Sequence, residues 1–306
     1  MGTRKFLIED KRHVIHPDRR RQQQFALCVS AWFALSMIAP ACGLARCEDT
    51  NVAINQETFG NGIRFMAQIE NATEVTIDFD CRSYKNAIPS SKLPASFALP
   101  GPRKVEILRF KQHVMNQEWL VGPCTHHWRY GFPSKVKTDQ NFVYRLPFES
   151  GNRFEVTQSY QGPHSHNQGS ESEFAIDFKM PLGTRICAAR EGVVIAIRDD
   201  STVGGADKNL ERCANFVIVR HSDGTYANYV HLNPHSVVVK LGQKVQAGTA
   251  LAQSGETGWT TTPHLHFDVY RVQNGQHRAT LPVRLRTSDG ILDRLYAGNF
   301  YGSSSQ

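Results

Sequence analysis

Residues 262–269 read TPHLHFDV, and further β-forming residues follow them. Side chains two positions apart on a strand project from the same face, so His264 and His266 point together while Leu265 and Phe267 point the other way. Two imidazoles on one strand face, backed by apolar residues, are a common way to offer nitrogen ligands to zinc. The alternative is a half-exposed strand whose polar face carries histidine without a metal.

From about residue 150 onward, the sequence pattern around this stretch is typical of a β domain. Strand-like runs occupy residues 192–197, 215–220 and 225–232, and glycines at turn spacing separate them. The turn at residues 221–224, HSDG, offers a glycine for a positive φ between two runs. Because no convincing amphipathic helix interrupts the pattern, we expect this domain to be almost all β.

Residues 50–148 show shorter alternating runs, at 74–80 and 104–110, with turn-rich stretches between them. This pattern indicates a smaller β-rich domain at the N-terminal side. His126 and His127 are conspicuous there, but adjacent strand residues face opposite ways, so a joint ligand role is not expected.

Histidine is concentrated in the second half, where seven of the 13 histidines lie between positions 164 and 266. Asp177 alternates there with apolar neighbours, as a strand residue facing either a cleft or solvent would. A catalytic zinc takes three protein ligands and keeps one open position, and His166, Asp177 and His266 can supply such a set. His264 and His231 then remain as imidazoles near the metal. No His-Glu-x-x-His sequence occurs, so the base would be a histidine.

The N-terminal segment predicts export. Residues 1–24 are polar and basic, and residues 25–45 form an uncharged run. This is either a secretory signal cleaved after Ala45 or a signal anchor retained in the membrane through residues 25–45. Lipid attachment at Cys42 and a buried core helix are alternatives that the sequence favours less. The basic side is N-terminal, so the bulk of the chain is expected on the exported side.

The same segment accounts for much of the positive charge. Residues 1–45 hold seven Lys or Arg and three Asp or Glu, so +4 of the total formal charge of +7 lies there. The basic balance is therefore no argument for nucleic-acid binding, and none is expected. The remaining mild excess suits an anionic polymer such as a cell wall.

Five cysteines follow residue 45, and none forms a Cys-x-x-Cys pair, so a cysteine zinc site is not expected. In an oxidising compartment the expected disulfides are Cys81–Cys124 and Cys187–Cys213, with Cys47 left over, although sequence alone does not determine connectivity.

Many short elements, taken in order, resemble one family, the lysostaphin-type zinc metallopeptidases. The resemblance covers roughly residues 150–285 and rests on Ser165-His166, AIDF at 175–178, GTRICAA at 183–189, EGVV at 191–194, HSDG at 221–224, YVHL at 229–232, GQKV at 242–245, GETG at 255–258 and HLHF at 264–267. It implies a β-barrel-sandwich hybrid fold with the duplicated hybrid motif, a Zn²⁺ cofactor, and cleavage of peptide stems or cross-links in peptidoglycan.

The resemblance also implies roles for individual residues. His166, Asp177 and His266 match the three zinc ligands, and His231 and His264 match the pair that activates the attacking water and stabilises the developing oxyanion. One departure is that ten residues separate His166 from Asp177, where the compact form of the family has a shorter spacing. His164 is therefore an alternative first ligand.

Together these observations predict an exported zinc metalloendopeptidase that acts on peptidoglycan peptides in the periplasm or cell envelope. The alternatives are a non-enzymatic relative that binds cell wall and activates another hydrolase, and an exported protein with a closed four-ligand structural zinc. The expected organisation is a signal segment at 1–45, a β-rich domain at 46–148, the peptidase domain at 149–290 and a tail at 291–306.

Overall fold

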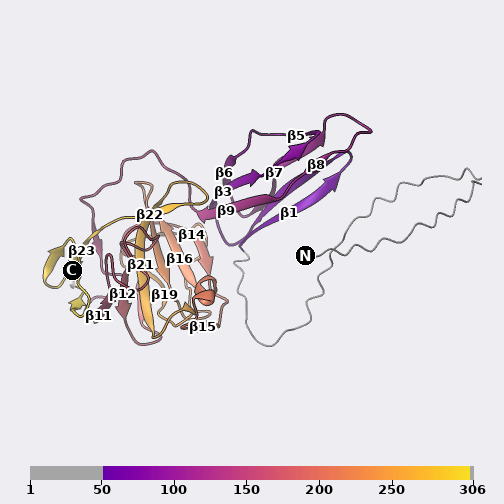
Figure 1. Cartoon of the computed structure of the whole chain (residues 1–306). Helices are drawn as coiled ribbons and strands as arrows, with labels where there is room; N and C mark the ends of the chain where they lie inside the picture. The colour runs from indigo at the N-terminus through magenta and orange to yellow at the C-terminus, as the bar shows by residue number, and fades with distance from the viewer. Residues whose placement is uncertain (1–50, 304–306) are drawn as a thin grey trace, which may run out of the picture. The chain divides into compact units, whose positions relative to one another are not determined.

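The structure is a computed structural model that describes residues 51–303. Within this range the chain is built from β-strands and one short 3-10 helix, so the prediction of a mainly β fold is confirmed (Figure 1). No helix within this range is long and apolar enough to cross a membrane. The predicted export segment lies outside the described residues, and the domain boundaries at 148 and 290 stay predictions.

The first part of the described chain, residues 51–130, forms two main sheets and a small one; we call it the N-terminal section. One sheet has the order β1-β2-β7-β5 and the other the order β6-β3-β9, and β4 pairs with β8. The strands are β1 (Val52–Phe59), β2 (Gly62–Ile69), β3 (Glu74–Cys81), β4 (Tyr84–Lys85), β5 (Ala87–Pro89), β6 (Ala95–Pro100), β7 (Arg103–Gln112), β8 (Leu120–Val121) and β9 (Cys124–Tyr130).

The disulfide prediction is half right. Cys81 and Cys124 lie opposite each other on β3 and β9 and are disulfide-bonded. The pairing of Cys187 with Cys213 is wrong, because Cys187 is a buried free thiol while Cys213 is disulfide-bonded. Burial raises the pKa of the Cys187 thiol to about 11, so it stays protonated and poorly nucleophilic at neutral pH.

The histidine-rich half is organised by a nine-stranded sheet. Its order is β18-β14-β16-β17-β21-β12-β11-β25, and β22 also pairs with β21. The strands are β11 (Arg153–Gln158), β12 (Ile176–Lys179), β14 (Gly192–Arg198), β16 (Phe216–Arg220), β17 (Tyr226–Val230), β18 (Lys244–Val245), β21 (His264–Val272), β22 (Arg278–Thr280) and β25 (Phe300–Gly302).

Shorter elements complete this half of the chain. β10 (Val143–Arg145), β23 (Arg284–Thr287) and β24 (Gly290–Leu292) form one small sheet; β13 (Arg185–Cys187) pairs with β19 (Ala250–Gln253), and β15 (Gly204–Gly205) with β20 (Gly258–Trp259). The 3-10 helix η1 (Lys208–Cys213) begins after Asp207, whose side chain accepts a hydrogen bond from the Asn209 N–H.

Successive side chains of strand β21 alternate between a buried apolar face and a face that carries histidines. Leu265 and Phe267 are buried on one face, within the main core of the nine-stranded sheet, and His264 and His266 lie on the other face. The predicted division of the TPHLHFDV stretch is therefore confirmed. Each burial of a large apolar side chain contributes roughly 1.5–3 kcal/mol, so the apolar face fixes the register that presents the histidines.

A second core is shared between the N-terminal section and the nine-stranded sheet. It contains Phe79 and Leu108 from the N-terminal section together with Ile218, Tyr226 and Tyr270 from the sheet. Backbone bonds also join the two, since the Thr73 N–H donates to the Ile195 carbonyl at 2.7 Å. The N-terminal section is thus packed against the same sheet that carries the histidines.

Candidate metal centre

Strand pairing brings the predicted carboxylate and one predicted histidine together. Asp177 on β12 lies directly opposite His266 on β21 in the antiparallel register. Side chains of directly opposite residues project from the same face, about 5 Å apart at Cβ. The Nδ1 atom of His266 lies 2.9 Å from the Oδ1 atom of Asp177.

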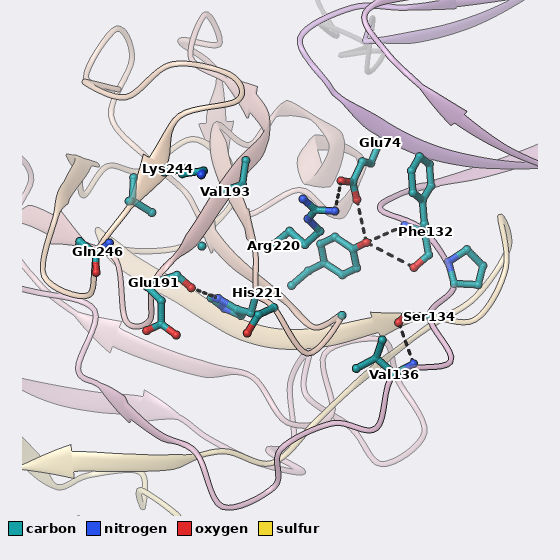
Figure 2. A pocket seen from close by; sticks show the side chains of 16 residues that line it. Glu74, Phe132, Ser134, Val136, Glu191, Val193, Arg220, His221, Lys244 and Gln246 are labelled. Carbon is teal, nitrogen blue, oxygen red and sulfur yellow. Dashed lines mark hydrogen bonds and ion pairs between the residues drawn. The ribbon is translucent and has the colours of Figure 1, made fainter.

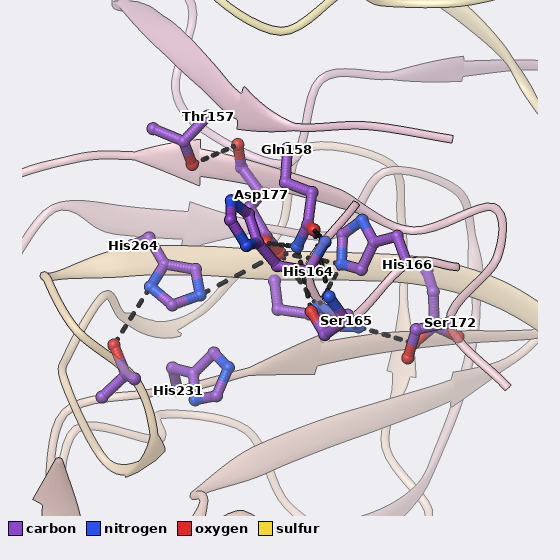
Figure 3. Close-up of polar contacts among 12 residues, drawn as sticks. Thr157, Gln158, His164, Ser165, His166, Ser172, Asp177, His231 and His264 are labelled. Carbon is purple, nitrogen blue, oxygen red and sulfur yellow. Dashed lines mark hydrogen bonds and ion pairs between the residues drawn. The ribbon is translucent and has the colours of Figure 1, made fainter. Parts of the chain in front are cut away.

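The loop between β11 and β12 supplies the third group, His166, which is fully buried. Its Nδ1–H donates to the Ser159 carbonyl at 3.3 Å, which leaves Nε2 pointing at the cluster. Gln158 joins the loop to the carboxylate: its Nε2 donates to Asp177 Oδ2 at 3.0 Å and its Oε1 accepts the backbone N–H of Ser165 (Figure 3).

The spacing of the three ligand atoms fits zinc. Ligands about 2.0–2.1 Å from a tetrahedral zinc lie about 3.3 Å from one another. Here His166 Nε2 is 3.3 Å from His266 Nδ1 and 3.4 Å from Asp177 Oδ1, and the third separation is the 2.9 Å between His266 and Asp177. Two imidazoles and one carboxylate also make a donor set that zinc favours.

Hydrogen bonds on the outer side select the tautomer that a metal needs. The Nε2–H of His266 faces the carboxylate of Asp268 at 3.2 Å, so the Nδ1 lone pair is directed into the cluster. The Nδ1–H of His166 is held by a carbonyl in the corresponding way. Both rings are therefore arranged as metal ligands.

The pKa values of Asp177 and His266 reflect the attraction between the charged groups of the cluster. Burial alone would raise the pKa of Asp177, but its close contacts with the His166 and His266 rings outweigh burial and hold that pKa well below its usual value. Burial opposes the charged form of His266, yet Asp177 and Asp268 raise its pKa to about 9. The Nδ1 lone pair of His266 is available to a cation only after this proton leaves.

The two other predicted histidines flank the cluster. The His264 ring lies with its Nε2 4.0 Å from Asp177 Oδ1, and its centroid is 4.5 Å from that of His231. Each ring has its Nδ1 hydrogen-bonded to a backbone carbonyl, His264 to Thr262 at 2.8 Å and His231 to Thr257 at 2.7 Å. Because a carbonyl only accepts, Nδ1 carries the hydrogen and Nε2 is the free nitrogen.

His231 is held in an unusual backbone conformation and in its neutral form. Its φ is +65°, in the left-handed region, directly after β17 ends. Burial and the neighbouring His264 and His266 lower the pKa of His231 to about 3. The ring therefore offers a lone pair at neutral pH.

The structure places the alternative ligand, His164, apart from the cluster. His164 is exposed and stands outside the three-residue cluster. Two supporting residues, Asp268 and Gln158, were not predicted. Asp268 could have been predicted from the sequence, because it continues the two-residue spacing of His264 and His266 along the same strand face. Gln158 carries no such signal, since its role depends on the loop that returns to β12.

A separate hollow of about 620 Å³ lies elsewhere, beside the start of β3 and the end of β16 (Figure 2). None of the five predicted site residues lines it. One of its two glutamates, Glu74, is already paired with Arg220 at 2.9 Å and accepts a hydrogen bond from the Tyr226 hydroxyl at 3.0 Å. The histidine cluster and not this hollow is therefore the candidate site.

Comparison with known families identifies the domain that holds the cluster. Residues 171–279 match the model of Peptidase family M23, a range that includes Asp177, His231, His264 and His266 and begins just after His166. Residues 171–279 are therefore identified as a peptidase family M23 domain, and we call this part of the chain the M23 domain. The resemblance to lysostaphin-type peptidases seen in the sequence is thereby confirmed.

Two curated relatives align with the M23 domain. The peptidoglycan DD-endopeptidase ShyA of Vibrio cholerae is 30% identical over 141 residues, which make up 46% of this chain and 26% of ShyA. Lysostaphin of Staphylococcus simulans is 31% identical over 107 residues, 35% of this chain and 20% of lysostaphin. The alignments thus span less than a third of either relative.

One solved structure is also similar in sequence to the M23 domain. The catalytic domain of lysostaphin from Staphylococcus simulans is 26% identical, with a TM-score of 0.26, over 39% of this chain and 78% of that domain.

Proposed function

We propose that this protein is a zinc metalloendopeptidase that hydrolyses peptide bonds in peptidoglycan stems or cross-links. The observation that carries the proposal is the triangle of His166 Nε2, Asp177 Oδ1 and His266 Nδ1; its edges of 3.3 Å and 3.4 Å match a tetrahedral zinc, and the third, at 2.9 Å, is shorter. Three protein ligands, and not four, are the count typical of catalytic zinc. The substrate class is proposed because ShyA, which aligns with the M23 domain, is named a peptidoglycan endopeptidase.

The chain's own residues supply the proton transfers. Bound zinc would polarise the scissile carbonyl and lower the pKa of the attacking water towards ~7. His231 and His264 each present a free Nε2, held in place by the bond from Nδ1–H to a carbonyl. The ring that accepts the proton of the water then carries an Nε2–H, which can stabilise the developing oxyanion or protonate the leaving amine.

The cellular setting follows from the N-terminal segment. We propose that residues 1–45 direct the chain to the periplasm or cell envelope, where peptidoglycan lies, and that residues 25–45 either are removed or hold the protein at the membrane. The Cys81–Cys124 disulfide supports this, because disulfides persist in oxidising compartments.

The test combines two measurements on one sample. A chain of residues 45–306 is assayed for zinc content and for new amine ends released from purified peptidoglycan, beside His264→Ala. We expect about one zinc per chain, as a three-ligand site requires, and cleavage that the variant lacks. Zinc without cleavage would favour the non-enzymatic activator, and a chain that binds no zinc would remove the basis of the proposal.

A further inference from the structure

The carboxylate behind the metal ligand His266 is itself held in place. Asp268 has a completely buried side chain, and its Oδ2 accepts from His266 Nε2 at 3.2 Å and from Asn228 Nδ2 at 3.1 Å. Asn228 lies directly opposite Asp268 on β17. Burying a carboxylate without charge compensation is strongly unfavourable, so the partner of Asp268 matters to the site.

That partner is Arg278 on β22. Its guanidinium spans both carboxylate oxygens of Asp268, with Nη1–Oδ1 and Nη2–Oδ2 each 3.4 Å. The same group stacks over the Tyr270 ring at 4.6 Å from its centroid. Arg278 therefore compensates the negative charge on Asp268, and the carboxylate keeps accepting from His266.

Arg278 is in turn connected to the N-terminal section. Its Nε lies 3.7 Å from Glu171 Oε2, and the other oxygen of Glu171 accepts from Arg129 Nη2 at 2.6 Å. Arg129 belongs to β9. Charges of alternating sign thus run from the N-terminal section to the metal ligand; we call this the ion-pair series, and it comprises Arg129, Glu171, Arg278, Asp268 and His266.

A second contact fixes the turn that leads into β22. The Gln276 N–H donates to Asp78 Oδ2 on β3 at 3.2 Å. A Cβ atom at Gly275 would lie 2.3 Å from the Asp78 backbone nitrogen, so only glycine lets the turn approach β3 this closely. The N-terminal section therefore holds both the start of β22 and, through Arg129 and Glu171, the guanidinium on it.

We propose that Asp268 and Arg278 are positioning residues for the metal ligand His266, and that the N-terminal section sets zinc affinity through Arg129 and Glu171. This rests on the proposed metal site. The physical basis is that an outer carboxylate fixes the tautomer and orientation of a ligating histidine, and that its own partners fix the carboxylate. The M23 domain would then reach its full metal affinity only with the N-terminal section docked.

The test measures the zinc dissociation constant by chelator competition, together with the melting temperature, on the 45–306 chain. Asp268→Asn should weaken zinc binding about 10- to 100-fold. Arg129→Gln, at a partly exposed side chain outside the three-residue cluster, should weaken it about three- to tenfold. The matched control is Arg109→Gln, because Arg109 forms an ion pair with Glu106 in the same section but outside the ion-pair series.

A double variant separates coupling from general destabilisation. If Arg129 acts through Asp268, Arg129→Gln should change zinc affinity little once Asp268→Asn is present. Equal effects in both backgrounds, or a lower melting temperature with unchanged zinc affinity, would overturn the inference and leave the metal site standing. Failure of the unaltered chain to bind zinc would instead overturn the metal site and this inference together.

Discussion

Within residues 51–303, two pairs of neighbouring histidines lie on strands, and only one pair contributes to the candidate metal cluster. His126 and His127 are adjacent on β9, so they face opposite ways: His126 stacks on Phe79, with 6.5 Å between ring centroids, and His127 lies across from Asp78. His264 and His266 are two apart on β21 and share a face. Spacing decides the difference, because it determines whether two imidazoles can meet one carboxylate.

The largest expected effect comes from removing a ligand. His266→Ala should weaken zinc binding by more than about 100-fold, since it removes one of three ligands and exceeds the loss of a supporting residue. The matched control is His127→Ala, which takes a histidine from the other pair. Metal content after dialysis measures both, and full zinc retention by His266→Ala would mean that the ligand assignment is wrong.

The next effect distinguishes ligands from flanking histidines on the same face. His264→Ala and His231→Ala should keep zinc but lower peptidoglycan cleavage about 10²- to 10⁴-fold, the usual range for loss of a proton-transfer group. Cleavage rate and metal content are measured on the same sample. Undiminished cleavage by either variant would exclude that histidine from proton transfer.

His221 shows how burial changes the pKa of a histidine that has no carboxylate as a hydrogen-bond partner. It is 2% exposed, its Nδ1–H donates to the Glu191 carbonyl, and within the described residues its Nε2 has no partner. Burial is the main reason that its pKa falls to about 4, and the nearby Arg190 adds to it while Asp223 opposes it. The unfolded chain therefore binds more protons than the folded one between about pH 6.5 and pH 4.

The contribution of neutral His221 to the free energy of unfolding is thus fully present above pH 6.5 and is lost as the pH falls towards 4. The loss amounts to about 3 kcal/mol, at about 1.4 kcal/mol per pKa unit. Denaturant unfolding at pH 7 and pH 4 should show a smaller decrease for His221→Asn than for the unaltered chain. The exposed His235 provides the control, His235→Asn, and identical pH dependence in all three proteins would contradict the assignment.

The smallest effect concerns the support of the loop that carries His166. Gln158→Ala removes the bonds to Asp177 and to the Ser165 N–H, so zinc affinity should fall about tenfold as the loop loses its fixed position. Gln56→Ala, at an exposed position on β1, is the matched control. Chelator competition measures both, and equal affinities would mean that the Ser159 contact alone positions His166.

Local pattern predicts the elements of this fold but not their partners. The alternating runs at 74–80 and 104–110 and the strand-like run at 192–197 correspond to β3, β7 and β14, because alternation and β-forming residue types are properties of neighbouring residues. The opposition of Asp177 and His266 depends on the register of strands 89 residues apart, which no local signal contains. The pairing of Cys187 with Cys213 failed for the same reason.

The candidate site divides in the same way. The proposed ligand residues could be named from the sequence because their residue types and family order are visible there, and Asp268 could have been named from its spacing. The sequence did not predict the involvement of Arg129, Glu171 and Arg278, because an ion pair between separate elements produces no periodic pattern in the sequence. Their contacts become visible only in the folded chain, where Glu171, in the loop before β12, contacts both Arg129 on β9 and Arg278 on β22.

The shared core between the N-terminal section and the nine-stranded sheet has a consequence for folding. Phe79 and Leu108 lie in one apolar cluster with Tyr226 and Tyr270, so neither part can unfold without exposing the other's buried surface to water. Calorimetry should therefore record a single cooperative transition for both parts. A chain trimmed to the M23 domain would expose a contiguous apolar patch and tend to aggregate, and an engineer wishing to isolate that domain would first have to make this face polar.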